Sequence, residues 1–246
     1  MRSRGLTARA SLVPLAAMAV LAVLVAVSCS KVPPDGAGLR VLLAGDSLLA
    51  QASARVRHDL ADHGDEVTIR AVPGSGLLAV NFDWQAELRR LATRRRPQVA
   101  VLEFAGNYLP PLRKGIPPQS EAFFRAWDAA TAQAVQTLTQ SGAVVYLVLI
   151  PPMRSPDLNR GVQRLNQLYA SLAARDAPRV GCSDGRAGLT GSDGGFVDTL
   201  PDARGRPVRL RQFDGVHFTP AGAARFADHI AEVLDREGSQ PPPNCV

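Results

Sequence analysis

An alternation of short apolar runs and longer amphipathic stretches fills this chain from Arg40 to Arg236. Strands that are covered on both faces read as unbroken apolar runs, and Ala143–Ile150 is such a run. The stretches between the runs have the length and periodicity of helices that pack against a sheet. Regular strand–helix alternation is typical of a parallel sheet with helices on both faces. The chain is therefore predicted to be an α/β protein, a three-layer α/β/α sandwich around a central parallel sheet.

The bounds of the expected elements follow from apolar periodicity and from the turn signals between the runs. The expected strands are Arg40–Ala44, Glu66–Val72, Val99–Phe104 and Ala143–Ile150. The expected helices are Leu48–His63, Trp84–Arg95, Ser120–Ser141, Leu158–Arg175 and Pro220–Arg236. Gly142 is expected to cap the third helix, and Arg94–Arg96 to complement the dipole at the end of the second. Residues 39–246 are thus expected to form one domain with a substantial core.

The N-terminus has the pattern of an export signal. The charged residues within residues 1–28 are all basic: Arg2, Arg4 and Arg9. The apolar stretch Ser11–Val27 follows, and it is short for a membrane-spanning helix, which needs about 20 apolar residues. Cys29 comes after small residues that resemble a bacterial lipobox, although Ala26 stands where Leu is usual.

Two fates of this segment stay open. Residues 1–28 are either a signal peptide cleaved before a lipidated Cys29 or an uncleaved membrane anchor. In both cases residues 29–38 form a linker, rich in Pro and Gly, to the folded domain. We therefore expect the domain to lie outside the cytoplasm, tethered to a membrane.

The remaining cysteines fit the same location. If Cys29 is lipidated, Cys182 and Cys245 are left as one pair. In an oxidising compartment such a pair is most simply a disulfide, which would fix the proline-rich C-terminal tail to the domain. Two unrelated free thiols are the alternative. No spacing of Cys and His suggests a metal site, so neither a metal nor a cofactor is expected.

The charge of the chain is mildly basic. The formal net charge is +6, and removal of the three arginines in residues 1–28 lowers it to +3. A dedicated nucleic-acid binder would show a concentrated basic stripe. The composition therefore argues against nucleic acid as a partner.

Polar and glycine-rich segments follow directly after the predicted strands. They are Ser47, Gly74–Gly76, Gly106–Asn107 and Pro151–Pro152. The carboxyl ends of parallel strands meet at one edge of the sheet, where ligands bind, so these segments are expected to lie together. Near the C-terminus Asp214 precedes His217 by three residues. A serine, an imidazole and a carboxylate are the groups that ester hydrolysis through an acyl-enzyme requires.

These segments resemble the four sequence blocks of the GDSL esterases and lipases, also called SGNH hydrolases. The blocks here are Gly45-Asp46-Ser47-Leu48, Ser75-Gly76, Gly106-Asn107 and Asp214-x-x-His217. One block alone is a weak signal, because Gly-Asp-Ser is common in turns. Four in order, each at its expected strand end, are specific. The resemblance implies the flavodoxin-like SGNH hydrolase fold.

The resemblance also implies roles for individual residues. Ser47 would be the nucleophile, His217 its general base, and Asp214 the group that orients the imidazole. The amides of Ser47 and Gly76 and the side-chain amide of Asn107 would form the oxyanion hole. Each residue also has an ordinary structural interpretation, as a helix cap or a turn residue, but their combination favours catalysis. Asp46 is expected to be a cap or turn residue without a catalytic role.

Tyr108, Arg209 and Arg211 are further candidates for substrate binding. Tyr108 stands where many members of the family have Asp, and it is expected to shape the wall of the acyl pocket. Arg209 and Arg211 alternate with apolar residues, which predicts a short strand with both arginines on one face. They would either grip an anionic or polyhydroxylated substrate or form a solvated face. Trp84 and Trp127 are expected in the core.

Three functions remain open on these grounds. The leading one is an exported, membrane-tethered serine ester hydrolase acting on small or short-chain O-acyl esters, with envelope glycans among the candidate substrates. A short acyl group is favoured because no additional apolar segment offers a long cleft or lid. The second is an O-acyltransferase that moves an acyl group to an envelope polysaccharide. The third is a non-catalytic envelope binding lipoprotein.

Overall fold

The computed structural model describes residues 38–108, 112, 115–238 and 245. The chain divides into two units, 1–31 and 32–246, and every described residue belongs to the second. The predicted signal or anchor, Cys29, and all of the linker except Gly38 therefore lie outside the described residues. Among the residues described, none of the helices combines the length and apolarity needed to cross a bilayer.

The core of the domain is a parallel sheet of five strands in the order β2-β1-β3-β4-β5. The strands are β1 (Arg40–Gly45), β2 (Glu66–Ala71), β3 (Val99–Glu103), β4 (Val144–Val148) and β5 (Val180–Ser183). Four of them were predicted, whereas β5 was missed because its short Val-Gly-Cys-Ser sequence has no apolar run. The predicted parallel α/β sheet is confirmed.

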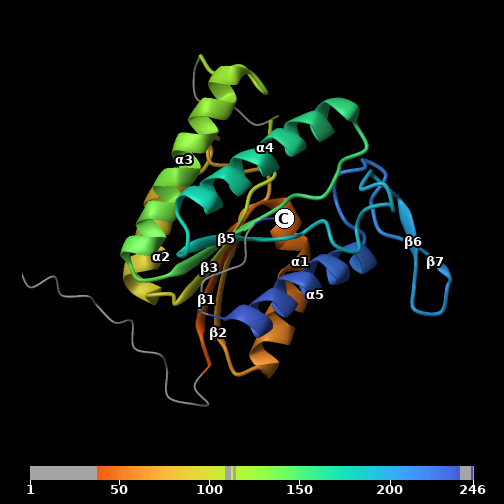
Figure 1. Ribbon diagram of the computed structural model, residues 1–246, viewed down its shortest axis with the longest axis horizontal. Helices are drawn as coiled ribbons and strands as arrows, with labels where there is room; N and C mark the ends of the chain where they lie inside the picture. Colours follow the sequence, from red (N-terminus) through yellow and green to blue (C-terminus); the bar gives the residue numbers. More distant parts are fainter. Residues whose placement is uncertain (1–37, 109–111, 113–114, 239–244, 246) are drawn as a thin grey trace, which may run out of the picture. The chain divides into compact units, whose positions relative to one another are not determined.

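Helices cover both faces of this sheet (Figure 1). The helices α1 (Ser47–Asp62) and α5 (Pro220–Glu237) lie side by side on one face. The other face carries α2 (Trp84–Arg95), α3 (Glu121–Gln140) and α4 (Pro156–Arg175). Trp84 and Trp127 are buried, as expected for core residues. The three-layer α/β/α sandwich is therefore confirmed.

Capping residues set the helix ends within one or two residues of the predictions. Asp46, rather than Ser47, caps α1, and its Oδ1 accepts a hydrogen bond from the Leu48 amide at 3.2 Å. The helix α4 begins two residues earlier than predicted, because Ser155 caps it and Pro156 occupies the first turn, a position that Pro favours. At the end of α3 the cap is Ser141, and the predicted cap Gly142 follows it.

A small hairpin lies outside the central sheet. It pairs β6 (Thr199–Pro201) with β7 (Pro207–Arg209) in antiparallel fashion, to the right of the sheet in Figure 1. The apolar–polar alternation around Arg209 predicted the strand β7. The sequence predicted neither the pairing of β7 with β6 nor that β7 ends at Arg209. Next comes the segment with Asp214 and His217, so the hairpin sits beside the predicted site.

The structure contains the disulfide predicted between Cys182 and Cys245. Their Cα atoms are 5.1 Å apart, and the bond closes a segment with a sequence separation of 63 residues. Cys182 belongs to β5, an edge strand of the sheet. The bond thus attaches the end of the chain to the sheet and limits the conformations of the unfolded chain.

Candidate active site

The segments that follow β1, β3 and β4 meet the Asp214–His217 segment around one cavity of about 230 Å³. Its wall combines apolar side chains with a smaller share of polar groups. The lining residues are Asp46, Ser47, Leu48, Ala105, Asn107, Tyr108, Met153, Leu158, Asp214, Val216 and His217. The cavity lies at the carboxyl ends of the strands, where parallel sheets bind their ligands.

Ser47, His217 and Asp214 form one hydrogen-bonded series at this cavity. The Ser47 Oγ lies 2.9 Å from His217 Nε2, and His217 Nδ1 lies 2.7 Å from Asp214 Oδ2. The serine is 170 residues from the histidine in sequence, so the fold alone brings them together. The roles of nucleophile, base and orienting carboxylate stay predictions, and this geometry is the one that those roles require.

The turn that carries the histidine is fixed by the Asp214 carboxylate itself. Asp214 Oδ1 accepts hydrogen bonds from the amides of Val216 (2.9 Å) and His217 (3.0 Å). Burial acts to raise the pKa of Asp214, but the hydrogen bonds from the His217 side chain and the two amides outweigh it and lower the pKa. The carboxyl group is therefore an anion at neutral pH, as an orienting group must be.

A neighbouring loop fixes the same turn from outside. The Arg154 amide donates to the Gly215 carbonyl at 3.1 Å, and the Arg154 side chain bonds to the Phe213 carbonyl and to Asp198. Gly215 has a φ of +70°, and a Cβ on it would lie 2.3 Å from the Arg154 Cβ. Only glycine fits at this position, because its φ lies in the left-handed region and the backbone packs directly against the Arg154 side chain.

Asp46 connects the Ser47 turn to the loop after β3. Its carboxyl group is fully buried and accepts from three donors, the Leu48 amide, the Ala105 amide at 2.8 Å and Asn107 Nδ2 at 2.8 Å. Burial raises the pKa of Asp46 to about 6, although the hydrogen bonds from Ala105 and Leu48 act in the opposite direction. The expectation that Asp46 caps the helix is confirmed, and the residue also positions Asn107.

Asn107 faces the cavity with its side-chain amide already engaged. Its φ is +42°, and Nδ2 donates both to Asp46 Oδ2 and to the Ser75 carbonyl. Because an amide nitrogen has two hydrogens, Nδ2 could donate to an oxyanion only after one of these two hydrogen bonds is broken. Gly76 lies beside Asn107, since a Cβ on it would be 3.5 Å from the Asn107 Cβ, but it is not among the cavity-lining residues.

Removing the Asn107 amide tests its predicted role in the oxyanion hole. We expect Asn107→Ala to lower kcat by about 10²–10³ with little change in KM, because the donor acts in the transition state. Asn107→Gly is the matched variant, because glycine accepts the positive φ without strain. Equal losses in both variants would identify the donor as the cause. A normal kcat in Asn107→Gly would remove Asn107 from the oxyanion hole.

Tyr108 forms part of the cavity wall, where the sequence placed it. Its ring is buried and packs against Phe123 at a centroid distance of 5.2 Å. The hydroxyl group is also buried and has no hydrogen-bond partner among the described residues. Burial raises the pKa of Tyr108 well above its ordinary value, so the phenol is neutral. Its contribution to the acyl pocket stays a prediction.

Arg209 and Arg211 do not share a face, contrary to the prediction. Arg211 is fully buried and donates to the carbonyls of Val216 (2.8 Å) and Pro152 (3.0 Å). Burial lowers the pKa of Arg211 to about 10. Because its guanidinium is inside the protein and does not line the cavity, Arg211 braces the histidine turn instead of gripping substrate.

The chain turns inward after β7, where Leu210 enters the core and its amide bonds to the Asp198 carbonyl. Arg209 stays at the surface, and its guanidinium lies 3.9 Å from the centroid of the Phe213 ring. The Phe213 side chain is 84% exposed and directly precedes Asp214. An exposed aromatic–arginine pair therefore stands at the rim of the site.

Sequence reasoning missed several residues that support the site. They are Glu103, Met153, Arg154, Leu158 and the bracing role of Arg211. A signal existed for Glu103, because it ends an otherwise apolar strand, Val-Ala-Val-Leu-Glu. No local signal marks Arg154, which contacts the Phe213 carbonyl 59 residues away. The same is true of Arg211, which joins the nearby Val216 carbonyl to the Pro152 carbonyl 59 residues away.

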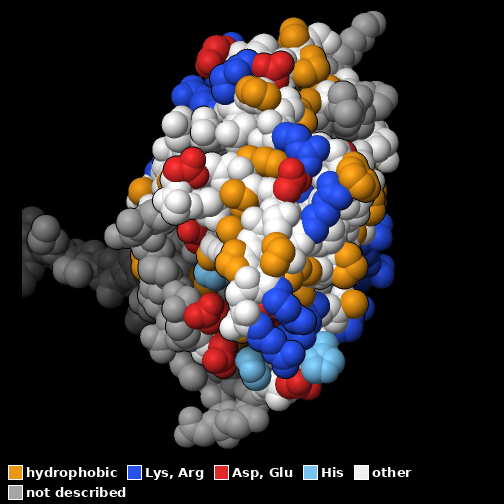
Figure 2. All heavy atoms as spheres, turned by 90° about the vertical axis from the view of Figure 1, so that its right-hand side faces the viewer, with side chains coloured by type: hydrophobic (Ala, Val, Ile, Leu, Met, Phe, Trp, Pro, Cys, Tyr) orange, Lys and Arg blue, Asp and Glu red, His pale blue; other side chains and the backbone are white. Residues whose placement is uncertain are grey.

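The surface near β6 and β7 is mixed in character. Figure 2 shows basic side chains in several separate groups on this face, with apolar side chains between them, and no continuous basic stripe. Within the described ranges no group of three or more His, Cys, Asp or Glu residues is arranged to hold a metal ion.

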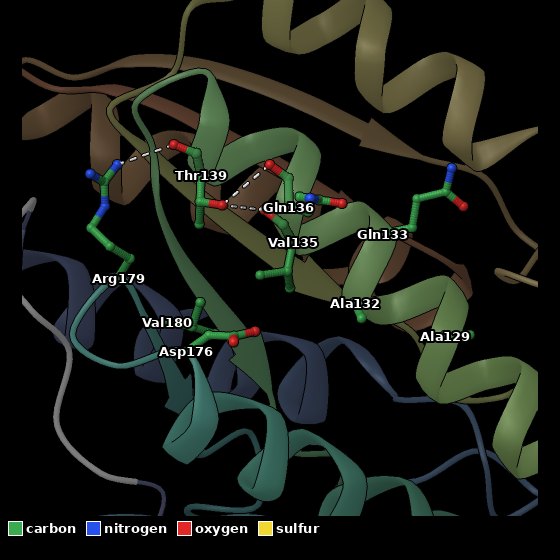
Figure 3. A pocket seen from close by; sticks show the side chains of 9 residues that line it. All are labelled: Ala129, Ala132, Gln133, Val135, Gln136, Thr139, Asp176, Arg179 and Val180. Atoms are coloured by element: carbon green, nitrogen blue, oxygen red, sulfur yellow. Dashed lines mark hydrogen bonds between the residues drawn. The ribbon is translucent and has the colours of Figure 1, made fainter.

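A larger groove of about 560 Å³ lies elsewhere, between α3, the end of α4 and the start of β5 (Figure 3). Its Arg179 guanidinium donates to the carbonyls of Thr139 (3.5 Å), in the last turn of α3, and Ala143 (2.9 Å), directly before β4. Such contacts satisfy carbonyls that a helix end leaves unpaired. The groove is at the amino end of β5 and does not contain the serine or the histidine.

Most of the described domain matches a known protein family. The model of a family described as "Protein of unknown function (DUF459)" matches residues 40–233. A search of curated proteins found no match.

Several solved structures are similar in fold. The structure described as TesA has a TM-score of 0.56 at 20% identity, covering 80% of this chain and 98% of that one. An acetylxylan esterase from Geobacillus stearothermophilus, Axe2, has a TM-score of 0.55 at 13% identity, covering 85% and 99%. The catalytic domain of peptidoglycan O-acetyltransferase A from Streptococcus pneumoniae has a TM-score of 0.51 at 16% identity, covering 82% and 95%. The SGNH hydrolase fold implied by the sequence blocks is confirmed.

Proposed function

This chain belongs to the DUF459 family, and we propose that it is a serine ester hydrolase acting through an acyl-enzyme. The observation that carries the proposal is the hydrogen-bonded series from Ser47 through His217 to Asp214 at the edge of a cavity. Serine is a weak nucleophile, and a neutral imidazole in contact with its hydroxyl activates it. The similarity to esterase structures supports the same reading through the shared fold.

The proposed reaction has two halves. His217 Nε2 takes the proton of Ser47 as its oxygen attacks the ester carbonyl, and the Asp214 carboxylate stabilises the imidazolium that forms. The oxyanion is stabilised by the start of α1, where the Ser47 amide is free of intrahelical bonds, and by the Asn107 amide. His217 then protonates the leaving alcohol. Water, activated by the same histidine, releases the acid and restores Ser47.

The cavity supports a short acyl group. Its volume of about 230 Å³ is below the range of about 300–1,000 Å³ that is typical for sites of drug-sized ligands. Tyr108, Met153 and Leu158 close the apolar side of it. A cavity of this volume suits a short acyl group better than a long one.

The test of the proposal uses the full chain in detergent with p-nitrophenyl acetate, butyrate and octanoate. We expect kcat/KM to be highest for the shortest esters, because the wall is close to the serine. Leu158→Ala should raise the ratio of kcat/KM for octanoate to kcat/KM for acetate on the order of tenfold. The smaller side chain would leave space for about one or two methylene groups of the acyl chain, and such space has an effect of this size. Leu168→Ala on the same helix is the control. No turnover of any ester, together with no labelling of Ser47 by a fluorophosphonate, would favour a non-catalytic binding role.

Acyl transfer to a glycan is the second candidate. The side chains of His217 and Asp214 are 36% and 46% exposed, so the alcohol side of the site is open to a large acceptor. The Arg209–Phe213 pair at the rim offers an aromatic face and a cation of the kind that binds sugars. The similarity in fold to a peptidoglycan O-acetyltransferase also supports it. The test measures how much of the acyl group is released to water as free acid and how much is transferred to an added glycan. Acylated glycan as the main product would favour the transferase over the hydrolase.

We further propose that the protein is exported and tethered to a membrane through a lipidated Cys29 or an uncleaved anchor. The support is the arginine-led apolar segment and the Cys182–Cys245 disulfide, a bond typical of oxidising compartments. Membrane fractionation of wild type and Cys29→Ala tests it. Loss of mass corresponding to lipid in the variant would indicate lipidation, and a soluble cytoplasmic wild type would contradict the proposal.

A further inference from the structure

Glu103 is a buried acid directly beneath the nucleophile turn. It is the last residue of β3, and its side chain is fully buried. Its Oε2 accepts hydrogen bonds from the amides of Asp46 (3.3 Å) and Leu49 (3.1 Å), on either side of Ser47 and Leu48. Gly45 permits this approach, since a Cβ on it would lie 2.9 Å from Glu103 Oε2 and 2.4 Å from the Glu103 carbonyl oxygen. The carboxyl group therefore holds the turn that presents the serine.

Two buried carboxyl groups, Glu103 and Asp46, lie side by side here, and only one can keep its charge. Like charges at such short range disfavour double ionisation. Asp46 has three donors on its two oxygens. Glu103 has two donors on Oε2, whereas Oε1 is buried without a partner among the described residues. A buried carboxylate oxygen without a donor is costly, so the proton belongs on Glu103 and the charge on Asp46.

The surrounding groups favour the same assignment. Burial, and then the charge of Asp46, raise the pKa of Glu103 well above its usual range. The other titratable groups that face the pair are Tyr169 from α4 and His217, and Tyr108 from the loop after β3 in turn interacts with Tyr169. Both tyrosines are neutral because burial raises the pKa of each, and His217 acts on Asp46 by lowering its pKa. Among the described residues, neither carboxyl group forms an ion pair with a lysine or arginine.

We propose that Glu103 is a positioning residue, a neutral carboxylic acid that holds the Ser47 turn and, by leaving Asp46 charged, orients the amide of Asn107. The chain of contacts is continuous: Glu103 binds the Asp46 amide, and the Asp46 carboxylate binds Asn107 Nδ2. The catalytic consequence rests on the proposed function, whereas the protonation of Glu103 does not.

The first test measures the proton itself. A neutral folded-state Glu103 keeps a proton that the unfolded chain releases above a pKa of about 4.3. Between pH 5 and pH 8 the folding equilibrium constant of Glu103→Gln should therefore rise relative to wild type by about tenfold per pH unit, until the folded pKa is reached. Glu103→Leu should show the same slope, and Glu87→Gln, at a surface ion pair, should show none. If the ratio of the folding equilibrium constants of variant and wild type does not change with pH for either Glu103 variant, Glu103 is ionised and the proposal is overturned. If neither variant folds, isotope-edited infrared spectra of the wild type replace this test. The C=O stretch of a protonated carboxylic acid at Glu103 would support the proposal, and its absence would overturn it.

The second test measures positioning through the rate at which a fluorophosphonate labels Ser47. Glutamine keeps a neutral acceptor for the two amides, so Glu103→Gln should retain labelling and turnover within a few-fold. Leucine removes the acceptor, so folded Glu103→Leu should lose at least about tenfold in kcat with KM little changed. Equal rates in wild type and Glu103→Leu would overturn the positioning role alone. Failure to label the wild type would instead overturn the proposed function, and the pH slope would still report the protonation state.

Discussion

Ser47→Ala is expected to lower kcat for p-nitrophenyl acetate by about 10⁴–10⁶-fold, because Ser47 is the nucleophile that contacts the His217 ring among the described residues. The Ser47 Oγ contacts His217 Nε2 at 2.9 Å, and the cavity opens at the same atom. The substitution should leave the free energy of unfolding within about 1 kcal/mol, since it removes one partly exposed hydrogen bond. Asp46, and not Ser47, caps the helix, so the cap is preserved.

The measurement is kcat together with the thermal unfolding midpoint. Ser53→Ala is the matched control, because Ser53 lies on the same helix and its hydroxyl bonds to the Leu49 carbonyl, away from the cavity. We expect it to leave kcat unchanged. Turnover that survives in Ser47→Ala, in a protein free of contaminating esterase, would show that the nucleophile is another residue.

Asp214→Asn is expected to lower kcat by about 10⁴-fold through the tautomer of His217. The asparagine oxygen would take the place of Oδ1 and keep the hydrogen bonds from the Val216 and His217 amides. Its Nδ2 would then face His217 Nδ1, two atoms that cannot both donate. The imidazole would have to place its hydrogen on Nε2, which could no longer accept the proton of Ser47.

The pH dependence separates this effect from a loss of fold. The pKa of Asp214 is lowered in the folded state, so its stabilising contribution is present above the unfolded value of about 3.9 and is lost only as pH falls toward the lower folded value. Asp214→Asn should thus reduce kcat across the neutral range without a new transition there, while stability at pH 7 falls modestly. Asp202→Asn, in the β6–β7 turn, is the control. Near-normal kcat in Asp214→Asn would remove Asp214 from the mechanism.

Much of the site could be predicted because the parallel sheet converts sequence position into spatial position. Ser47 and Asn107 each follow a strand, and the carboxyl ends of parallel strands share one edge. Tyr108 was expected at the cavity wall from the family resemblance, because it follows Asn107, and it does line the cavity. The prediction for Arg211 was wrong because strand periodicity was extended past the end of β7 at Arg209, where the chain turns into the core. Alternation predicts a face only while the strand continues.

The sequence by itself determined the layers of the fold, the edge of the sheet that bears the site, and the identity of the serine, histidine and aspartate in it. These depend on patterns that are local, namely apolar periodicity, capping residues and short motifs. Only the tertiary structure decided that Glu103 lies under the nucleophile turn, that Arg211 joins the histidine turn to the Pro152 carbonyl, and that the cavity is small. The physical reason is that burial and charge depend on partners from distant segments. Glu103 meets the Leu49 amide across 54 residues, and no local pattern records that contact.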